Sequence, residues 1–168
     1  MIKINNIKFE EKFTEINIRH RLYEEKNYIT LIINTEFYPA LYKDNVVTGA
    51  IEAKIDIEGI KSLDELQDKL YNGDIGSITV SVNNDGVWEH NSYDNFKLEL
   101  KDRTNRKLKF KLTAEDLELS TTGTLVSLYT TSTSRERLLK EFNLDDFYDK
   151  SIIREVGNNK IYKYFTKE

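Results

Sequence analysis

The stretch Val47-Thr-Gly-Ala-Ile-Glu-Ala-Lys-Ile-Asp-Ile-Glu58 decides the fold class of this chain. Apolar or small residues fall at every second position, and the residues between them are mostly polar. A period of two residues places one set of side chains on a core and the other in water, as in a half-buried β-strand. The same alternation marks residues 16–23 and several short runs between about residues 13 and 131. The sequence therefore predicts a mainly β fold, either an antiparallel β-sandwich or a partly open barrel.

Composition narrows the class of protein. The chain has 168 residues, 39% hydrophobic and 32% charged, so we expect one domain, residues 1–168, with a real core. A minor division into a β core, residues 1–131, and a helical segment with a hairpin, residues 132–168, is the alternative. The net charge of −4 argues against general affinity for duplex nucleic acid, and the absence of cysteine excludes disulfides and thiolate chemistry. With no signal peptide and no apolar run of about 20 residues in the chain as given, we expect a soluble, cytoplasmic protein.

Three hairpins are expected between residues 14 and 112, and matching their apolar positions predicts their registers. The first joins residues 14–23 to residues 28–37, after which Pro39 ends the strand. Its predicted pairs are Leu22 with Ile29, His20 with Leu31 and Tyr23 with Tyr28. The second joins residues 77–82 to residues 87–92 through a three-residue loop. Its predicted pairs are Val82 with Trp88 and Val80 with His90, which places both aromatic residues on the core face.

The third predicted hairpin, residues 96–101 and 107–112, carries an unusual concentration of positive charge. Seven basic residues within residues 97–111 outnumber Glu99 and Asp102. These residues, which we call the basic ridge, are Lys97, Lys101, Arg103, Arg106, Lys107, Lys109 and Lys111. The predicted register pairs Leu100 with Leu108, and therefore also Lys101 with Lys107 and Lys97 with Lys111.

Like charges in direct opposition across two strands are unfavourable, so we expect something acidic beside the basic ridge. One candidate is another part of the same chain, either the row Glu52, Asp56 and Glu58 or the group Glu115, Asp116 and Glu118. The other is an acidic partner, a phosphate or a single-stranded nucleic acid. A solvated strand face is the plainer interpretation.

Two helices are expected beside the strands. A capping box at residues 62–65, followed by leucines at helical spacing, predicts a helix over residues 63–71. A second capping box predicts a short helix near residues 134–142. The chain is then expected to end in a hairpin over residues 151–156 and 160–166.

Few side chains suggest chemistry. His20 and His90, the only histidines, fall on predicted core faces, where we interpret them as hydrogen-bonded core residues rather than as a base or a pair of metal ligands. Trp88, the only tryptophan, is expected to pack on the core, although it could instead stack on a sugar or a base. We interpret the acidic row of Glu52, Asp56 and Glu58 as a solvated strand face rather than a cation site. We therefore expect no catalytic residue, no metal and no cofactor.

These observations favour a protein that is not an enzyme. The chain has no phosphate-binding glycine loop and no nucleophile elbow. We expect a non-catalytic interaction or structural module, such as a component of a protein assembly, a phage-type particle or an inhibitor/immunity pair. One alternative is a barrel that binds a small apolar ligand near Trp88 and His90, and a second is single-stranded nucleic-acid or polyanion binding through the basic ridge. The expected partner is another protein or a second copy, with no membrane and no duplex nucleic acid.

Overall fold

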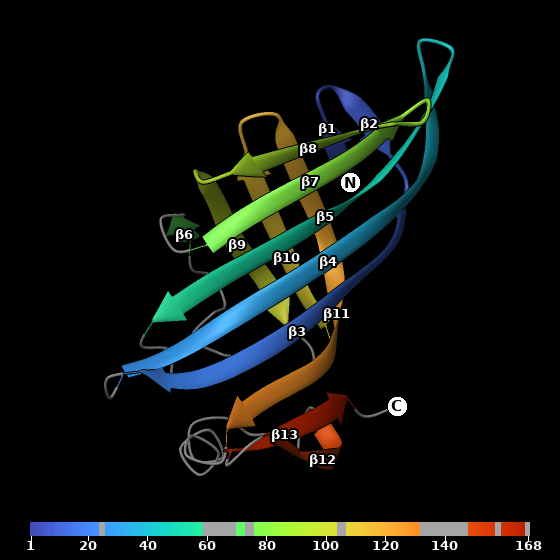
Figure 1. Cartoon of the computed structure of the whole chain (residues 1–168). Coiled ribbons are helices and arrows are strands. Elements are labelled where there is room, and N and C mark those ends of the chain that lie inside the picture. Colours follow the sequence, from blue (N-terminus) through green and yellow to red (C-terminus); the bar gives the residue numbers. More distant parts are fainter. Residues whose placement is uncertain are drawn as a thin grey trace.

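The computed structural model describes residues 1–23, 26–58, 70–72, 76–103, 107–131, 148–156 and 159–166. These residues form thirteen strands of one hydrogen-bonded sheet (Figure 1). The strands are β1 Ile2–Ile4, β2 Ile7–Phe9, β3 Glu11–Tyr23, β4 Lys26–Tyr42, β5 Asn45–Glu58, β6 Leu70–Asn72, β7 Gly76–Asn84, β8 Val87–Tyr93, β9 Phe96–Arg103, β10 Lys107–Ala114, β11 Leu117–Thr131, β12 Tyr148–Val156 and β13 Asn159–Thr166.

The strand order explains how one sheet makes two layers. The main path runs β6-β9-β10-β11-β3-β4-β5-β7-β8, while β1 and β13 each pair with β11 and bring β2 and β12 with them. All described strand pairs are antiparallel except one. β11 runs parallel to β3 and pairs Leu125 with Ile16. This parallel contact joins a chain segment near residue 16 to one more than a hundred residues later, and it is where the two halves of the sheet meet.

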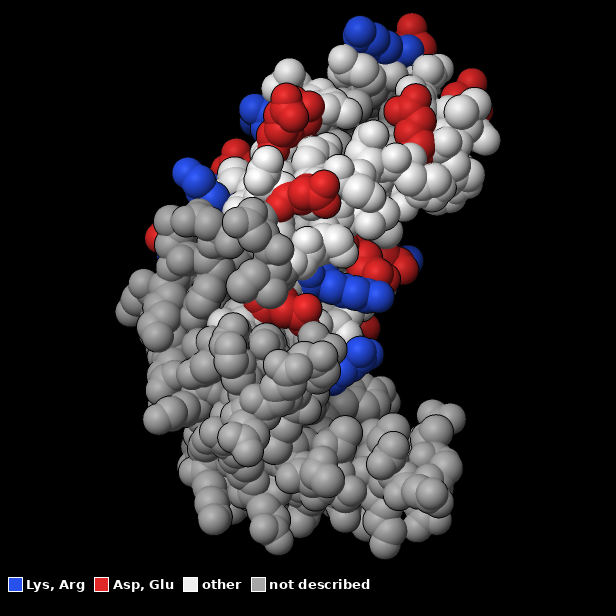
Figure 2. All heavy atoms as spheres, turned by 60° about the vertical axis from the view of Figure 1, so that its left-hand side comes forward, with Lys and Arg blue, Asp and Glu red and all other residues white. Residues whose placement is uncertain are grey.

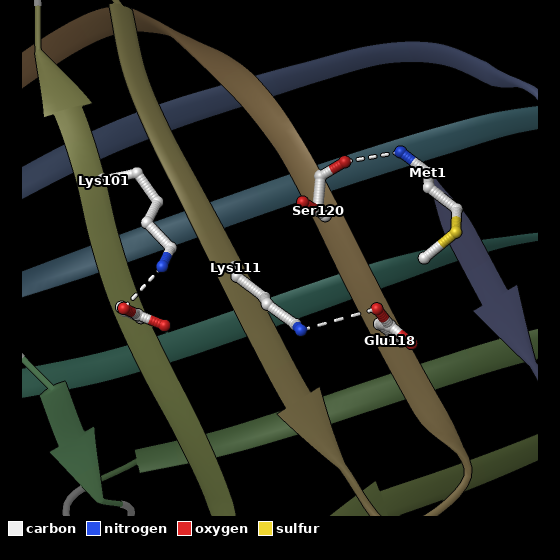
Figure 3. A network of polar contacts seen from close by, with 6 residues as sticks. Met1, Lys101, Lys111, Glu118 and Ser120 are labelled. Carbon is white, nitrogen blue, oxygen red and sulfur yellow. Dashed lines mark hydrogen bonds and ion pairs between the residues drawn. The ribbon is translucent and has the colours of Figure 1, made fainter.

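The sheet folds over on itself at this contact. In Figure 1, β3, β4, β5, β7 and β8 form the front layer, and β9, β10 and β11 cross behind it at a steep angle. Figure 3 shows the same crossing from the side of β10 and β11. Strands that cross steeply between facing layers are typical of orthogonal β packing. The predicted antiparallel β-sandwich or partly open barrel is therefore confirmed.

Apolar side chains fill the space between the layers. β-Branched residues dominate the front layer, whereas leucine and phenylalanine dominate the back layer. Fully or almost fully buried examples are Ile16, Ile18, Ile33, Ile51, Ile55 and Ile78 in front and Leu98, Phe110, Leu112 and Leu119 behind. Each such side chain contributes about 1.5–3 kcal/mol relative to an exposed one, so alternation along the strands is the main source of stability.

A polar cluster holds β3 against β4 and β11 near the junction. The Thr14 hydroxyl donates to the Glu11 carboxylate at 2.5 Å and lies 2.9 Å from the Thr35 hydroxyl. Thr121 of β11 donates to the other oxygen of the same carboxylate. Thr14 and Thr35 are buried, and their mutual hydrogen bond offsets the cost of removing both hydroxyls from water.

The first hairpin keeps the predicted faces but not the predicted pairs. Ile16, Ile18, Ile29 and Leu31 are buried, as the alternation indicates. The register is nevertheless shifted by two residues. Leu22 pairs with Asn27, His20 with Ile29, Arg21 with Tyr28 and Tyr23 with Lys26. The predicted pair of Tyr23 and Tyr28 is thus wrong, because the strands reach closer to the tip and each extra pair extends the ladder.

Two further predictions need correction. Pro39 does not end the strand as predicted, since β4 continues through it to Tyr42. The pairing of β4 with β5 is irregular between Phe37 and Ala40, and at such an irregularity the missing N–H of proline breaks no ladder bond. The helix predicted over residues 63–71 is wrong at its end, since residues 70 and 71 belong to β6 and pair with β9. Residues 61–69 and the helix predicted near residues 134–142 lie outside the described residues. The predicted terminal hairpin corresponds to β12 and β13.

Candidate functional site

The turn between β7 and β8 decides where Trp88 and His90 lie. Asp85 and Gly86 both have positive φ angles, 52° and 86°, which is the type I′ turn that joins two strands through two residues. The side chain of Asn83 supports this turn, because its Oδ1 accepts a hydrogen bond of 2.8 Å from the Gly86 N–H. The resulting pairs include Asn84 with Val87, Asn83 with Trp88 and Ser81 with His90.

The predicted three-residue loop is therefore wrong, and the two faces of β8 are exchanged. Trp88 and His90 lie on the outer face of the sheet, not in the core beside Val80. Trp88 is 55% exposed, and its ring stacks on the imidazole of His90 with centroids 6.1 Å apart and planes 3° from parallel. His90 Nδ1 also lies 2.8 Å from the Ser81 hydroxyl. The two rings form an exposed aromatic ledge rather than core packing.

β8 is also an edge strand. Among the described residues it pairs with β7 and with no strand on its other side. Its residues are exposed except for the partly buried Tyr93. In a hairpin closed by a two-residue turn, Asn84 and Val87 form a hydrogen-bonded pair, and such pairs alternate with non-bonded pairs along the ladder. The backbone N–H and C=O groups that point to the free edge are therefore those of Trp88, His90 and Ser92.

Exposed apolar side chains gather at the end of the molecule next to this edge. Leu41 and Val46 pair across the end of the β4–β5 hairpin and are 78% and 52% exposed. The β7–β8 turn lies alongside, because the Asp85 N–H donates to the Val46 carbonyl at 3.2 Å. Figure 1 shows the turns of these two hairpins at the same end of the front layer. Val87 and Trp88 follow the β7–β8 turn on opposite faces of β8, and Val87 is 64% exposed. We call Leu41, Val46, Val87 and Trp88 the apolar hairpin end.

Sequence reasoning missed the apolar hairpin end, although a signal was present. Leu41 and Val46 flank the turn at Lys43 and Asp44, where both φ angles are positive and polar residues are usual. Apolar residues on both sides of an exposed type I′ turn contribute nothing to the core. Their presence in such a place is a sequence feature that indicates a contact surface.

At its other end, β8 turns toward the core. Tyr93 is partly buried and packs against the core cluster. Burial raises the pKa of its phenol, and the carboxylates of Asp116 and Glu115 raise the pKa further. The end of β8 therefore lies near the turn between β10 and β11, and Tyr93 anchors that end of the edge strand.

The basic ridge has a different register from the predicted one. Glu99 pairs with Lys111, Lys97 with Thr113 and Asp102 with Lys109, after a bulge near Lys101. The predicted pairs of Lys101 with Lys107 and of Lys97 with Lys111 are therefore wrong. A shift of two residues keeps the leucines inside and places acidic residues opposite basic ones, which removes the like-charge opposition.

Acidic side chains of the same chain lie among these lysines. Lys101 Nζ is 2.5 Å from a Glu99 carboxylate oxygen, and Lys111 Nζ is 3.6 Å from Glu118 on β11 (Figure 3). Glu118 belongs to one of the two acidic groups that the sequence suggested as neighbours of the ridge. In Figure 2 acidic and basic side chains intermingle over the described part of the face shown, without a continuous patch of either sign.

Three of the remaining candidates fall wholly or partly outside the described residues. The side chain of His20, that of Arg103 and the whole of Arg106 lie outside the described residues. Glu52 is 3.5 Å from Lys54, and Asp56 accepts a hydrogen bond from Thr30, so this row is engaged within its own sheet. Among the described residues no group of three potential metal ligands occurs.

One open hollow of about 450 Å³ lies on the outer face of the front layer. Polar side chains line most of it, including those of Glu15, Asn34, Glu36, Glu52, Thr79 and Ser81. Ser81 connects the hollow to the aromatic ledge through its hydrogen bond with His90. A polar, open hollow of this kind does not resemble the enclosed apolar cavity that a small apolar ligand needs.

Comparison with known proteins adds no relative. No protein-family model, no curated protein and no solved structure matches the chain. A helix long and apolar enough to cross a bilayer is also not found within the described residues.

Proposed function

We propose that this chain is a non-catalytic interaction module of a larger protein assembly. Its proposed binding surface consists of the apolar hairpin end and the adjoining free edge of β8. The observation that carries the proposal is that four exposed large apolar side chains flank the turns of two neighbouring hairpins, with Leu41, Val46 and Trp88 on the outer face and Val87 on the other face. Clustered apolar groups of this kind are typical of contact surfaces, whereas single exposed ones are ordinary.

The edge strand supports the same proposal. A free edge offers unpaired N–H and C=O groups that an extended segment of a partner can extend into a longer sheet. Monomeric proteins usually protect such edges with lysine, proline or a bulge. β8 contains none of these three, and its only formally charged residue, Glu89, pairs with Val82 on the core side of the strand, where it is the one protective feature of this edge. Trp88 belongs to both the apolar hairpin end and the edge, and tryptophan is enriched among the residues that dominate binding energy.

Site-specific photo-crosslinking in cells that make the protein tests this proposal. A photoreactive residue at Leu41 is expected to give adducts with another protein chain, and one at Thr122, exposed on β11, serves as the control. Replacing Val46 with Asp in the Leu41 derivative should abolish the adducts while the far-ultraviolet circular dichroism stays unchanged. Equal adducts at both positions, or none at Leu41, would contradict the proposal.

Polyanion binding by the basic ridge remains the second proposal, supported by exposed Lys107 and Lys109 on the outer face of β10. The same cells allow it to be distinguished. A photoreactive residue at Lys109 that yields nucleic-acid adducts, with none from Leu41, would favour the ridge. Ion pairs of Lys101 and Lys111 with neighbouring glutamates weaken this proposal, because they neutralise part of the local charge.

A further inference from the structure

We infer that the partner of β8 is β8 of a second copy of this chain, paired antiparallel about a two-fold axis at His90. This inference rests on the proposed function, since it uses the same edge. The first support is regularity: β8 is seven residues long and pairs with β7 without a bulge. Trp88, His90 and Ser92 therefore present their backbone groups to the free edge at an even spacing, as a ladder requires.

The position of the axis follows from the length of the strand. His90 is the central residue of Val87–Tyr93, so an axis there is the one that pairs the whole strand with its copy. Each residue of β8 then lies opposite a residue that is on the same face of the joined sheet. The opposed residues are Val87 and Tyr93, Trp88 and Ser92, Glu89 and Asn91, and His90 with its symmetry mate. An axis at Glu89 would instead oppose two carboxylates, and one at Asn91 would leave Val87 without a partner residue on the copy's β8.

The side chains of β8 suit this arrangement. The carboxylate of Glu89 meets the amide of Asn91 across the interface rather than a second carboxylate, and the ionisable groups that do face each other are the two His90 imidazoles at the axis. Trp88 meets the small Ser92, which leaves its exposed indole room to lie over the partner's strand. A contact between identical surfaces is isologous and closes as a dimer. Two copies would then share one continuous sheet from β3 of one to β3 of the other.

A single introduced cysteine reports this geometry directly, because the chain has no cysteine of its own. Residues of a hydrogen-bonded antiparallel pair have Cα atoms about 5.5 Å apart, which is within the range that a disulfide spans. His90→Cys should therefore form a covalent dimer under mild oxidation. Val87→Cys is the matched control, since this residue is also exposed but lies near Tyr93 of the copy and far from its own symmetry mate.

Sedimentation of the unmodified protein provides the second measurement. The wild-type chain should sediment as a dimer when its concentration is raised to roughly 100 µM. This concentration exceeds the micromolar dissociation constants of weak specific complexes. Ser92→Pro removes an outward N–H without removing a bond to β7, and it should weaken dimerisation at least tenfold with unchanged circular dichroism.

Failure of the inference can be told apart from failure of the proposed function. A wild-type chain that stays monomeric, or disulfides that form as readily in Val87→Cys as in His90→Cys, would overturn self-pairing. If photo-crosslinks from Leu41 still reach a different protein, the interaction module stands with another partner. If those crosslinks are also absent, both proposals fall.

Discussion

Gly49→Ala should destabilise the protein strongly, because β5 has no room for a side chain at this position. A Cβ placed on Gly49 would lie 2.2 Å from the carbonyl oxygen of Ser81 on β7 and 3.1 Å from the ring of Phe37. Ordinary contact begins at 3.4 Å, so the overlap with the Ser81 oxygen is about 1.2 Å (3.4 minus 2.2). The ring cannot easily move away, since it packs against Phe9 with centroids 4.5 Å apart.

The magnitude follows from what must give way. Moving β7 by about 1 Å would stretch the ladder bonds beside Gly49 beyond 3.2 Å, and each lost bond costs about 0.5–1.5 kcal/mol. Overpacking itself costs about 1–3 kcal/mol, and the restricted unfolded chain returns about 0.4–1 kcal/mol. The expected net loss is about 2–3 kcal/mol. With a urea m-value of about 2 kcal/mol/M, the midpoint should fall by about 1 M or slightly more.

Urea unfolding followed by far-ultraviolet circular dichroism measures this loss, and Gly123→Ala is the matched control. A Cβ at Gly123 would meet the side-chain atoms Cδ1 and Cγ1 of Ile16 at 2.5 and 2.8 Å, and a side chain can change rotamer more easily than a strand can move. The control should therefore lose less, about 1 kcal/mol. A Gly49→Ala variant within about 0.5 kcal/mol of the wild type, or a larger loss in the control, would refute this packing argument.

Two further predictions test the ends of β8. Asn83→Ala removes the acceptor that holds the Gly86 N–H, so we expect a loss of about 0.5–1.5 kcal/mol in urea, and no loss would show that the turn forms without it. Tyr93→Phe should flatten the alkaline decline of stability. Burial raises the pKa of the Tyr93 phenol above its unfolded value, so its stabilising contribution is present below about pH 10 and lost as the pH rises through the folded pKa. Equal slopes of unfolding free energy against pH for both proteins, between about pH 9 and 11, would contradict this.

The faces of the strands could be predicted from the sequence, but the registers could not. Period-2 alternation shows which residues are buried, and Ile16, Ile51 and Ile55 lie in the core as expected. A shift of two residues leaves every face unchanged, so apolar matching alone cannot distinguish such registers. The first and third hairpins both differ from their predicted registers for this reason. The parallel contact of β11 with β3 lies even further beyond local patterns, because no short stretch encodes a partner a hundred residues away.

The second hairpin shows how a small local choice changes the functional interpretation. Asn83-Asn84-Asp85-Gly86 permits either a three-residue loop or a two-residue turn, and the type I′ turn prevails because its twist matches that of the strands. The two loops differ in length by one residue. A slip of one residue moves the side chains of β8 to the opposite face of the sheet, and it also changes which of its backbone N–H and C=O groups point toward β7. With the longer loop Trp88 would be packed inside. With the observed turn, Trp88 and His90 lie outside, and their own N–H and C=O groups point to the free edge. The same residue pair therefore supplies both side chains and backbone to the candidate interface, and mutations that lengthen this turn should remove both together.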